Sequence, residues 1–247
     1  MLPTFNEAEN ISDVLHKVRS VVPDADVLVV DDGSPDGTAD LAEGLGRELG
    51  QITVLRRTEK NGLGAAYRAG FAWGLERGYE AMVEMDSDLS HDPGDLPALL
   101  ITLDAAADLV IGSRYVPGGT IPQWSWHRRA LSRWGGRYSA GMLGLAVNDP
   151  TAGFRAYRAS LLRKLDLDSV IAEGYGFQIE MTYRVVETGS RIVEVPIAFT
   201  DRVRGTSKMS SRIVFEAFGL VTWWAVRDRL LGGARRRRRR ALSALDA

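Results

Sequence analysis

Two aspartates separated by a single residue, Asp86 and Asp88, have the types and spacing to bind a divalent cation. They follow an apolar run at residues 81–85, so the sequence places them at the end of a buried strand. Their carboxylate oxygens suit Mg²⁺ or Mn²⁺, and an ion held there can also bind a diphosphate. The same pattern arises by chance, with one acid capping a helix and the other lying in a solvated turn. The predicted strand end favours the metal site.

A second acidic segment, residues 31–38 with the sequence DDGSPDGT, also follows an apolar run. Its glycines and proline are typical of a tight turn, and Asp36 or Thr38 could cap the helix that follows. Asp31 and Asp32 are then the carboxylates left for a ligand. Either of them could accept hydrogen bonds from a ribose or a base.

The segment GLGAAY at residues 62–67 is close to the glycine fingerprint of dinucleotide-binding proteins. Tyr67 stands where that fingerprint needs a small residue, and the segment does not follow the first predicted strand. A hydride-transfer enzyme is therefore disfavoured. Two interpretations stay open: a loop whose backbone approaches a nucleotide, or simply the beginning of a helix.

Four basic residues occur singly in polar segments: Arg114, Arg128, Arg202 and Lys208. Surface charge is the ordinary interpretation of any one of them. The formal net charge is −1, and the six consecutive arginines at 235–240 carry six positive charges, which leaves −7 for the remainder. Isolated cations in such an acidic remainder are candidates for pairing with phosphates.

The elements that must position these residues alternate along the first two thirds of the chain. Short apolar runs are separated by segments with apolar residues at helical spacing, which predicts an α/β fold with a mostly parallel central sheet flanked by helices. Ligands of such sheets bind at the carboxyl ends of the strands, where the acidic segments lie. The predicted strands are 27–30, 52–55, 81–85 and 109–111, and the predicted helices are 7–21, 38–49, 65–77 and 96–105.

Beyond residue 112 the alternation stops. The sequence predicts a loop at 116–120, a helix at 128–145, further strands at 149–157 and 192–199, and a mobile loop at 205–211. We therefore expect a catalytic domain over 1–211, an amphipathic helix over 212–234 and a disordered, arginine-rich tail over 235–247.

The composition of the 247 residues, 45% hydrophobic and 26% charged, is that of an ordinary globular protein. Its lack of cysteine excludes disulfides, thiolate zinc sites and a cysteine nucleophile, and its three scattered histidines argue against a histidine metal centre. The longest apolar run, 213–226, is too short to span a bilayer, and no secretory signal opens the sequence.

Trp223 and Trp224 lie in this apolar run, ahead of the arginines at 235–240. They fit an interfacial anchor, in which aromatic side chains enter lipid while arginines meet anionic headgroups. They also fit a core-packing helix followed by a solubilising tail. Six arginines attract nucleic acid as well, but no interleaved aromatic and basic residues support that interpretation. We expect an anionic membrane surface, and no nucleic acid, as a partner.

In their order along the chain, the motifs resemble those of the polyprenol- and dolichol-phosphate mannose synthases, which are inverting family 2 glycosyltransferases with a GT-A fold. The resemblance runs from residue 2 to about residue 209, and the ordered series is far more specific than any single block. The arginine- and alanine-rich style is similar to that of actinobacterial proteins. The matching blocks are LPTFNE (2–7), DDGSPDGT (31–38), GLG (62–64), MDSDLSH (85–91), GSRY (112–115), Arg128 with Ser132, GFR (153–155), GYGFQIE (174–180), Asp201-Arg202 and GTSK (205–208).

This resemblance implies a role for each matching position. The guanosine of GDP-mannose is expected to bind to Pro3, Phe5, Glu7, Val30 and Asp32. The metal and the diphosphate are expected to bind to Asp86, the Ser87 backbone and Asp88. Arg202 and Lys208, on a loop that could close over the donor, are expected to neutralise the leaving diphosphate. The lipid phosphate is expected to bind to Arg114, Arg128 and Ser132. The implied catalytic set is Asp86, Asp88, Arg114, Arg202 and Lys208.

The activity implied is mannose transfer from GDP-mannose to a polyprenyl or dolichyl monophosphate, with Mg²⁺ or Mn²⁺, at the cytoplasmic face of the membrane. The alternatives are a related transferase that uses another nucleotide sugar, such as one moving glucose to a lipid phosphate, and a non-catalytic nucleotide-binding protein.

The sequence departs from the family pattern in three places. Only Met1 and Leu2 precede the Pro-Thr block, which indicates either a truncated start or a weak sheet edge, and Ser87 replaces the usual alanine. The family's transmembrane extension is missing. We therefore expect peripheral attachment through the C-terminal helix and tail or through a separate membrane-anchoring protein.

Overall fold

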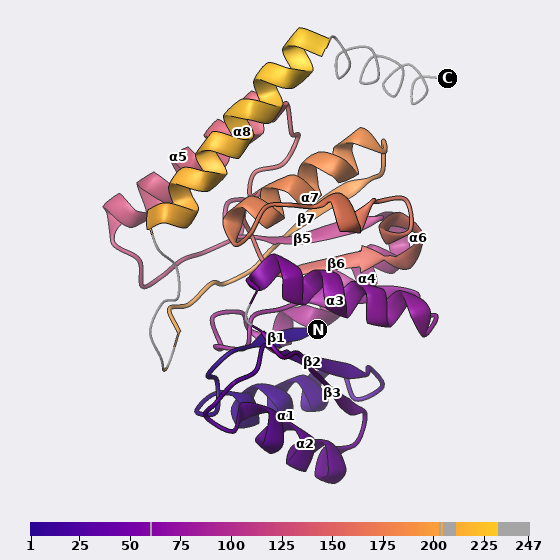
Figure 1. Cartoon of the computed structure of the whole chain (residues 1–247). Coiled ribbons are helices and arrows are strands. Elements are labelled where there is room, and N and C mark those ends of the chain that lie inside the picture. Colours follow the sequence, from indigo (N-terminus) through magenta and orange to yellow (C-terminus); the bar gives the residue numbers. More distant parts are fainter. Residues whose placement is uncertain (60, 203, 205–210, 232–247) are drawn as a thin grey trace.

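The computed structural model describes residues 1–59, 61–202, 204 and 211–231, with the backbone alone at 211–215 and 231. The chain forms an α/β fold, as the alternating apolar pattern predicted (Figure 1). The strands are β1 (Leu2–Thr4), β2 (Val27–Asp31), β3 (Ile52–Arg56), β4 (Ala81–Glu84), β5 (Leu109–Ser113), β6 (Arg155–Arg158) and β7 (Ile192–Pro196). The α-helices are α1 (Ile11–Val21), α2 (Thr38–Leu49), α3 (Leu63–Glu76), α4 (Leu96–Ala106), α5 (Trp126–Leu143), α6 (Ala159–Leu162), α7 (Tyr175–Glu187) and α8 (Ser211–Leu231).

The described strands form two sheets that meet at β1 and β4. The first sheet is parallel in the order β1-β2-β3, and the second is ordered β4-β6-β5-β7, with β6 antiparallel to both of its neighbours. The Met1 amino group donates to the Val83 carbonyl at 2.7 Å, and the Met85 N–H donates to the Met1 carbonyl at 3.2 Å. The combined order is therefore β3-β2-β1-β4-β6-β5-β7. Since β1 is bonded on both sides, the sheet edge expected there is covered by β4.

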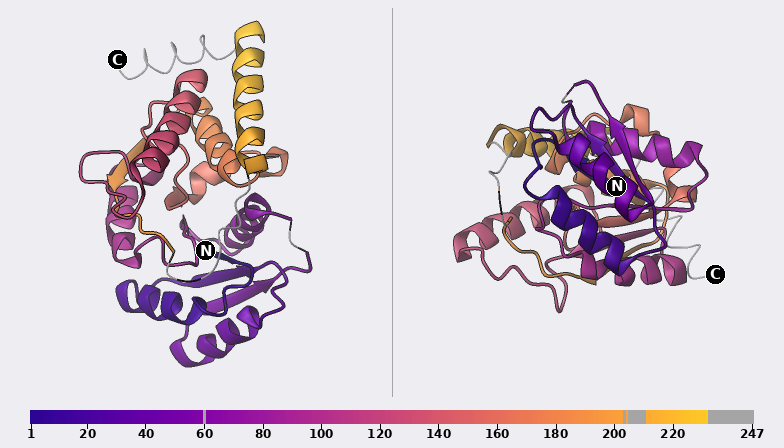
Figure 2. Two further views of the ribbon diagram at one scale, coloured as in Figure 1. Left: turned by 90° about the vertical axis from the view of Figure 1, so that its left-hand side faces the viewer. Right: turned by 90° about the horizontal axis from the view of Figure 1, so that it is seen from below.

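Alternate strand residues enter different apolar cores, because successive side chains of a strand point to opposite faces. Leu109 and Ile111 of β5 pack in a cluster with α3 and α7, whereas Val110 between them packs in a cluster with α1 and α4. In β2, Val29 joins the α1 cluster and Val30 packs toward α3. Helices therefore cover both faces of the sheet, which fixes the strand ends in space (Figures 1 and 2).

Some predicted elements have different bounds in the structure. The helix expected from residue 7 begins at Ile11, because Asn10 and Ile11 both donate to the Glu7 carbonyl at 2.9 Å and make a turn there. The strand expected at 149–157 is confined to Arg155–Arg158, because Asp149 bonds to a side chain in a loop. The helix predicted at 128–145 spans Trp126–Leu143.

The last described helix, α8, corresponds to the amphipathic helix predicted at 212–234, and it packs along α5 (Figures 1 and 2). The ring of Phe218 lies 5.2 Å from that of Tyr138, and the hydroxyls of Tyr138 and Thr222 are 2.8 Å apart. No helix in the described ranges has both the length and the apolar character to cross a membrane. The tail predicted at 235–247, and residues 205–210 of the predicted loop, lie outside the described residues.

Candidate active site

The carboxyl ends of β1, β2, β4, β5 and β7 open into one cavity of about 340 Å³. The crevice at the carboxyl ends of parallel strands is where α/β proteins bind ligands. We call its acidic wall the residues Pro3, Phe5, Glu7, Asp32, Asp86, Ser87 and Asp88, and its basic wall the residues Arg114, Trp124 and Arg128. Arg202 lines the same cavity. Most of the predicted site residues thus meet, although they come from distant parts of the sequence.

The turn after β4 is held by its own polar groups. The Ser87 hydroxyl donates to the Pro3 carbonyl at 2.8 Å, which ties this turn to β1. The Ser90 N–H donates to Asp88 Oδ1 at 3.0 Å, and the Asp86 N–H donates to His91 Nδ1 at 3.2 Å. The Asp86-Ser87-Asp88 segment is therefore fixed before any ligand arrives.

His91 is a residue whose role sequence reasoning did not foresee. Its ring is buried and lies 5.1 Å from that of Phe154 and 5.4 Å from that of Phe199. Burial lowers the pKa of His91, which favours the neutral imidazole that accepts the Asp86 N–H. Burial also raises the pKa of Asp86, and the neighbouring Asp88 carboxylate reinforces this effect.

The two aspartates fit a divalent cation whose remaining ligands are supplied by a substrate. Among the described residues no group of three or more histidine, cysteine and carboxylate side chains is arranged to hold a metal by itself. Mg²⁺ commonly binds to one or two carboxylates, with water and substrate phosphates supplying the other ligands. Asp88 Oδ2 instead contacts Arg202 Nη2 at 3.1 Å, an ion pair whose arginine side chain is 30% exposed.

The acidic wall also contains the segment predicted to hold a nucleoside. Pro3, Phe5, Glu7 and Asp32 line the cavity, but Val30, the fifth residue of that predicted set, does not: it is 1% exposed and packs in the core.

Asp31 is the last residue of β2 and Asp32 follows it, but of the two only Asp32 lines the cavity. Asp31 accepts hydrogen bonds from Thr4 and Ser34, so it stabilises the turn and is not spare for a ligand. Arg57, which sequence reasoning missed, pairs with Asp32. The sequence carries no signal for this pair, because the parallel register of β2 and β3 brings the two strand ends together.

The segment after β2 has a further positioning role. Asp36 Oδ1 accepts the Thr38 N–H at 3.1 Å in a turn just before α2, but the N-cap of this helix is Gly37, so neither of the two residues predicted as caps, Asp36 and Thr38, occupies that position. Asp36 also accepts the Ala8 N–H at 3.0 Å, and Thr38 Oγ1 accepts the Glu7 N–H at 2.9 Å. The side chains of Asp36 and Thr38 therefore hold the loop that carries Phe5 and Glu7.

The glycine segment 62–64 proves to be a helix start. Gly62 has φ +94°, and a Cβ there would lie 2.3 Å from Glu173 Oε2, so the position needs glycine. The Gly64 N–H donates to the same carboxylate oxygen at 2.7 Å. Tyr67 is buried and stacks on Phe177.

The basic wall is built on a buried ion pair. Arg114 donates through Nε and Nη2 to the two carboxylate oxygens of Asp149, both at 2.7 Å, and Nη2 also donates to Thr151 at 2.8 Å. Arg114 is 5% exposed and Asp149 is fully buried. Although burial opposes it, the guanidinium lowers the pKa of Asp149, which keeps this carboxylate ionised. Asp149 is a site residue that the sequence did not reveal.

The other predicted phosphate-binding residues of α5 have different surroundings. Arg128 contacts Asp201 at 3.0 Å and lies over the ring of Trp124, 3.9 Å from its centre. Ser132 lies one helical turn further on the same helix but does not line the cavity, and its hydroxyl accepts from Tyr115 at 2.7 Å. Lys208, also predicted, lies outside the described residues.

A buried polar network supports the cavity from below. Arg155 is fully buried and donates to the carbonyls of Pro150 and Gln178 at 2.7 and 3.0 Å, which joins the 150–153 loop to α7. The Gln178 amide, which lines the cavity, donates to Glu84 at 2.9 Å. Burial raises the pKa of Glu84 to about 7.

The first 166 residues, which include β1 to β6 and the acidic wall, match the family model described as Glycosyl transferase family 2. The chain belongs to this family. Across 231 residues, 93% of this chain and 87% of the relative, it is 51% identical to the polyprenol monophosphomannose synthase of Mycolicibacterium smegmatis. Across 232 residues, 94% of this chain and 95% of the relative, it is 53% identical to the undecaprenyl-phosphate mannosyltransferase of Micrococcus luteus.

A solved structure supports the fold of this family 2 glycosyltransferase. The mannosyltransferase PcManGT of Pyrobaculum calidifontis, crystallised with GDP-Man and Mn²⁺, superposes with a TM-score of 0.61 and covers 92% of this chain and 63% of its own. At 19% identity this likeness concerns the fold alone, and it agrees with the GT-A arrangement expected from the motifs.

Proposed function

We propose that this family 2 glycosyltransferase moves mannose from GDP-mannose to the phosphate of a polyprenyl, dolichyl-type monophosphate, with inversion at the anomeric carbon. The products are polyprenyl-phosphate mannose and GDP. The observation that carries the proposal is one cavity in which an acidic wall with two paired aspartates faces a basic wall with two arginines. The two relatives above 50% identity, both named for mannose transfer to a polyprenol-type acceptor, support the choice of substrates.

The acidic wall is the proposed donor site. Pro3, Phe5, Glu7 and Asp32 line it where the guanosine would lie, and Val30 would support that pocket from the core. Asp86 and Asp88, with the Ser87 backbone, would hold Mg²⁺ or Mn²⁺ together with the diphosphate. The metal would supply positive charge to the diphosphate as it leaves.

In this proposal Arg202 can also pair with the diphosphate of the donor. It pairs with Asp88, and a metal ion on that carboxylate would release the guanidinium toward the diphosphate. Lys208, six residues further on, is the other cation proposed to neutralise GDP.

The basic wall is the proposed acceptor site. Asp149 holds Arg114 in place, and Arg128 lines the same wall, so two guanidinium groups would orient the lipid phosphate. Ser132 shares the helix face of Arg128 one turn away, where it could add a hydrogen bond. A phosphate is already anionic near neutral pH, so it attacks without a strong general base. One of its oxygens forms the bond to the anomeric carbon while the bond to the diphosphate breaks and GDP keeps the electron pair.

The acceptor's chemistry also bears on location. A polyprenyl chain resides in a membrane, so we place the enzyme at the cytoplasmic face, attached peripherally and either directly or through a separate anchoring protein. An anionic membrane surface is the proposed partner.

The test is a transfer assay with the purified full chain. GDP-mannose labelled in the sugar is incubated with a polyprenyl monophosphate and Mn²⁺ or Mg²⁺, and UDP-glucose is the matched donor control. We expect labelled lipid from GDP-mannose, and none after addition of EDTA. Preference for UDP-glucose, or nucleotide binding without turnover, would overturn the proposal in favour of a glucosyltransferase or a non-catalytic binding protein.

A further inference from the structure

Between its two walls the cavity has a floor, which we define as the residues Gly153, Tyr175 and Gln178. The chain crosses from one wall to the other within two residues. Thr151 accepts a hydrogen bond from Arg114 Nη2 at 2.8 Å, and a Cβ built on Gly153 would lie 3.8 Å from Asp86 Oδ1. In the proposed reaction a diphosphate leaves from the acidic wall and a phosphate attacks from the basic wall. The transferred sugar therefore lies over the floor.

Gln178 brings a buried polar group to this floor. The residue is 2% exposed, and its side-chain amide donates through Nε2 to Glu84 at 2.9 Å. Within the described part of the chain its other polar atom, Oε1, is buried and accepts no hydrogen bond. Burying an acceptor without a donor is unfavourable, so an atom of this kind in a cavity lining marks the place of a hydrogen-bond donor.

The position of Gln178 is fixed from below. Glu84, which holds Nε2, is the last residue of β4 and stands two residues before Asp86. The buried Arg155 donates to the Gln178 carbonyl at 3.0 Å and to the Ala152 carbonyl at 2.7 Å. The amide is therefore set in place relative to both Asp86 and the loop that carries Gly153.

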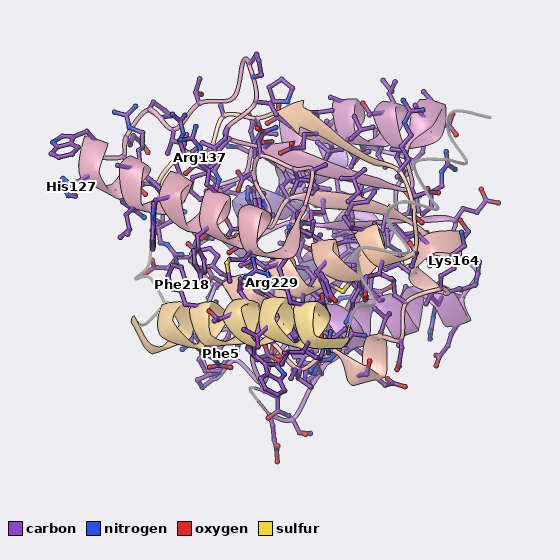
Figure 3. The ribbon with its side chains drawn as sticks, turned by 90° about the horizontal axis from the view of Figure 1, so that it is seen from above. Phe5, His127, Arg137, Lys164, Phe218 and Arg229 are labelled. Carbon is purple, nitrogen blue, oxygen red and sulfur yellow. The ribbon has the colours of Figure 1, made fainter. Side chains whose placement is uncertain are left out.

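Helix α7, which carries two of the floor residues within its first four positions, is held on its other side by α8. A Cβ built on Gly176 would lie 3.7 Å from the Cβ of Ala217, and the Tyr183 hydroxyl donates to Asp228 at 2.6 Å. Figure 3, seen from above, shows α8 running alongside α5. The helix thus presents its first turn to the cavity from a braced position.

Tyr175 brings a second uncharged polar group to the floor. Burial raises the pKa of Tyr175, an effect that Arg114 of the basic wall opposes and Asp86 of the acidic wall reinforces, so its hydroxyl lies between the two walls. Three positions separate it from Gln178, which places both side chains on one face of the helix. A phenol hydroxyl both donates and accepts hydrogen bonds.

Gly153 leaves space beside the metal-binding carboxylate. Its φ is not positive, and a Cβ there would come no closer than 3.8 Å to a described atom outside the neighbouring residues. Neither the backbone conformation nor the packing therefore requires glycine at this position. The absence of a side chain instead keeps the cavity open in front of Asp86.

We propose that Gly153, Tyr175 and Gln178 form the seat of the transferred hexose, and that Gln178 Oε1 accepts a hydrogen bond from one of its hydroxyl groups. This inference rests on the proposed function, because it assigns a site to the sugar of the donor. An ionised phosphate has no proton to donate to Oε1, and a lipid chain has none either. A sugar hydroxyl supplies the donor that this atom lacks.

The experiment is titration calorimetry of the full chain, in the presence of Mn²⁺, with GDP and with GDP-mannose. The ratio of the two affinities measures the contribution of the sugar. Gln178→Met keeps the length of the side chain and removes the acceptor. We expect this variant to bind GDP-mannose about tenfold more weakly and GDP within about twofold of the wild type. An unchanged ratio would overturn the proposal.

Analogues of GDP-mannose that each lack one sugar hydroxyl identify the partner of Gln178. The analogue without that hydroxyl should bind the wild type and Gln178→Met equally, whereas the other analogues should still distinguish the two proteins. A loss of the same size for every analogue would mean that Gln178 acts only on the shape of the cavity, and the proposal would be wrong.

Two further variants test the floor without disturbing the Glu84 contact. Tyr175→Phe should weaken GDP-mannose about threefold. Gly153→Ala places a methyl group in the seat and should weaken GDP-mannose at least about tenfold, with the affinity for GDP and the thermal unfolding midpoint unchanged. Normal GDP-mannose binding by Gly153→Ala would place the sugar elsewhere and contradict the proposal. The matched control is Gln51→Met on the exposed turn before β3, which should keep the wild-type ratio.

The transfer assay separates this inference from the proposed function. A wild type whose GDP-mannose affinity depends on the floor, but which transfers mannose to no polyprenyl phosphate, would overturn the proposed function and leave the sugar seat standing. Full transfer by the wild type, with the wild-type affinity ratio in Gln178→Met and Gly153→Ala, would leave the function standing and overturn the seat.

Discussion

The two walls of the cavity differ in how they hold their carboxylates. Behind the basic wall, Asp149 is fully buried and bonded through both oxygens to Arg114, which lowers its pKa against the effect of burial. Behind the acidic wall, Glu84 is equally buried but bonded to the neutral amide of Gln178, and burial raises its pKa to about 7. Burial alone therefore does not determine the charge of a carboxylate here. Its partner does.

The same contrast separates two ion pairs within the cavity. Arg114 and Asp149 are 4% and 0% exposed and share three hydrogen bonds, one of them through the Arg114 backbone N–H. The side chains of Arg202 and Asp88 are 30% and 9% exposed, and Arg202 Nη2 lies 3.1 Å from Asp88 Oδ2. We interpret the Arg114–Asp149 pair as permanent and the Arg202–Asp88 pair as exchangeable. A metal ion can replace a partly exposed guanidinium more readily than a buried guanidinium that binds both carboxylate oxygens.

The largest expected effect comes from the exchangeable pair. Asp88→Asn should lower mannose transfer by about 10³-fold, because it removes a metal-binding carboxylate at the leaving diphosphate. The measurement is the initial rate with saturating GDP-mannose over a range of Mn²⁺ concentrations. Asp104→Asn, on the outer surface of α4, is the control and should keep the wild-type rate. Full activity in Asp88→Asn would remove the basis for a metal at this wall.

The permanent pair should matter most for stability. Asp149→Asn leaves the Arg114 charge buried without its counterion, so we expect the free energy of unfolding to fall by about 3 kcal/mol. Asp201→Asn breaks an ion pair whose side chains are 51% and 42% exposed, and should cost less than about 1 kcal/mol. Urea denaturation of both variants measures the difference. Equal losses would mean that the two pairs are not distinct in kind.

Removing the arginine of the permanent pair should affect one substrate more than the other. Arg114→Ala should lower kcat/KM for the lipid acceptor by about 10²-fold, because one of two proposed phosphate ligands is lost. The affinity for GDP, measured by titration calorimetry, should stay within about twofold of the wild type. A parallel loss of GDP affinity would show that Arg114 serves the acidic wall as well, and the division into donor and acceptor walls would have to be abandoned.

The smallest effect concerns Glu84 and depends on pH. Its pKa is raised in the folded state, so the unfolded state loses its proton first and the wild type loses stability as pH rises from about 4.5 toward 7. Glu84→Gln is neutral at every pH and escapes this loss. The variant should gain about 2 kcal/mol over the wild type between pH 5 and pH 8, as measured by denaturation. Glu48→Gln on the surface of α2 should show no such trend.

The sequence was informative wherever the signal is local. Short apolar runs predicted the strands at 27–30, 52–55, 81–85 and 109–111, because a strand that is covered on both faces is apolar along its length. The turn at 31–38 was recognised from its glycines and proline, because turn formation involves only neighbouring residues. The aspartates at 86 and 88 could be placed at a strand end for the same reason, since they directly follow the run that forms β4.

Long-range pairing was decided by the tertiary structure. Nothing in the sequence links Arg114 to Asp149, Asp32 to Arg57 or Gly64 to Glu173, because these partners are brought together by strand order and by loops that cross the cavity. The same packing buries Val30 in the core and brings the Ser132 hydroxyl to the Tyr115 hydroxyl. Residue types and order along the chain thus determined which chemistry is available and where each strand ends. Which charges face one another, and which of them are buried enough to be fixed, depended on how the sheet and its helices pack, because electrostatic energies depend on distance and solvent exposure in three dimensions.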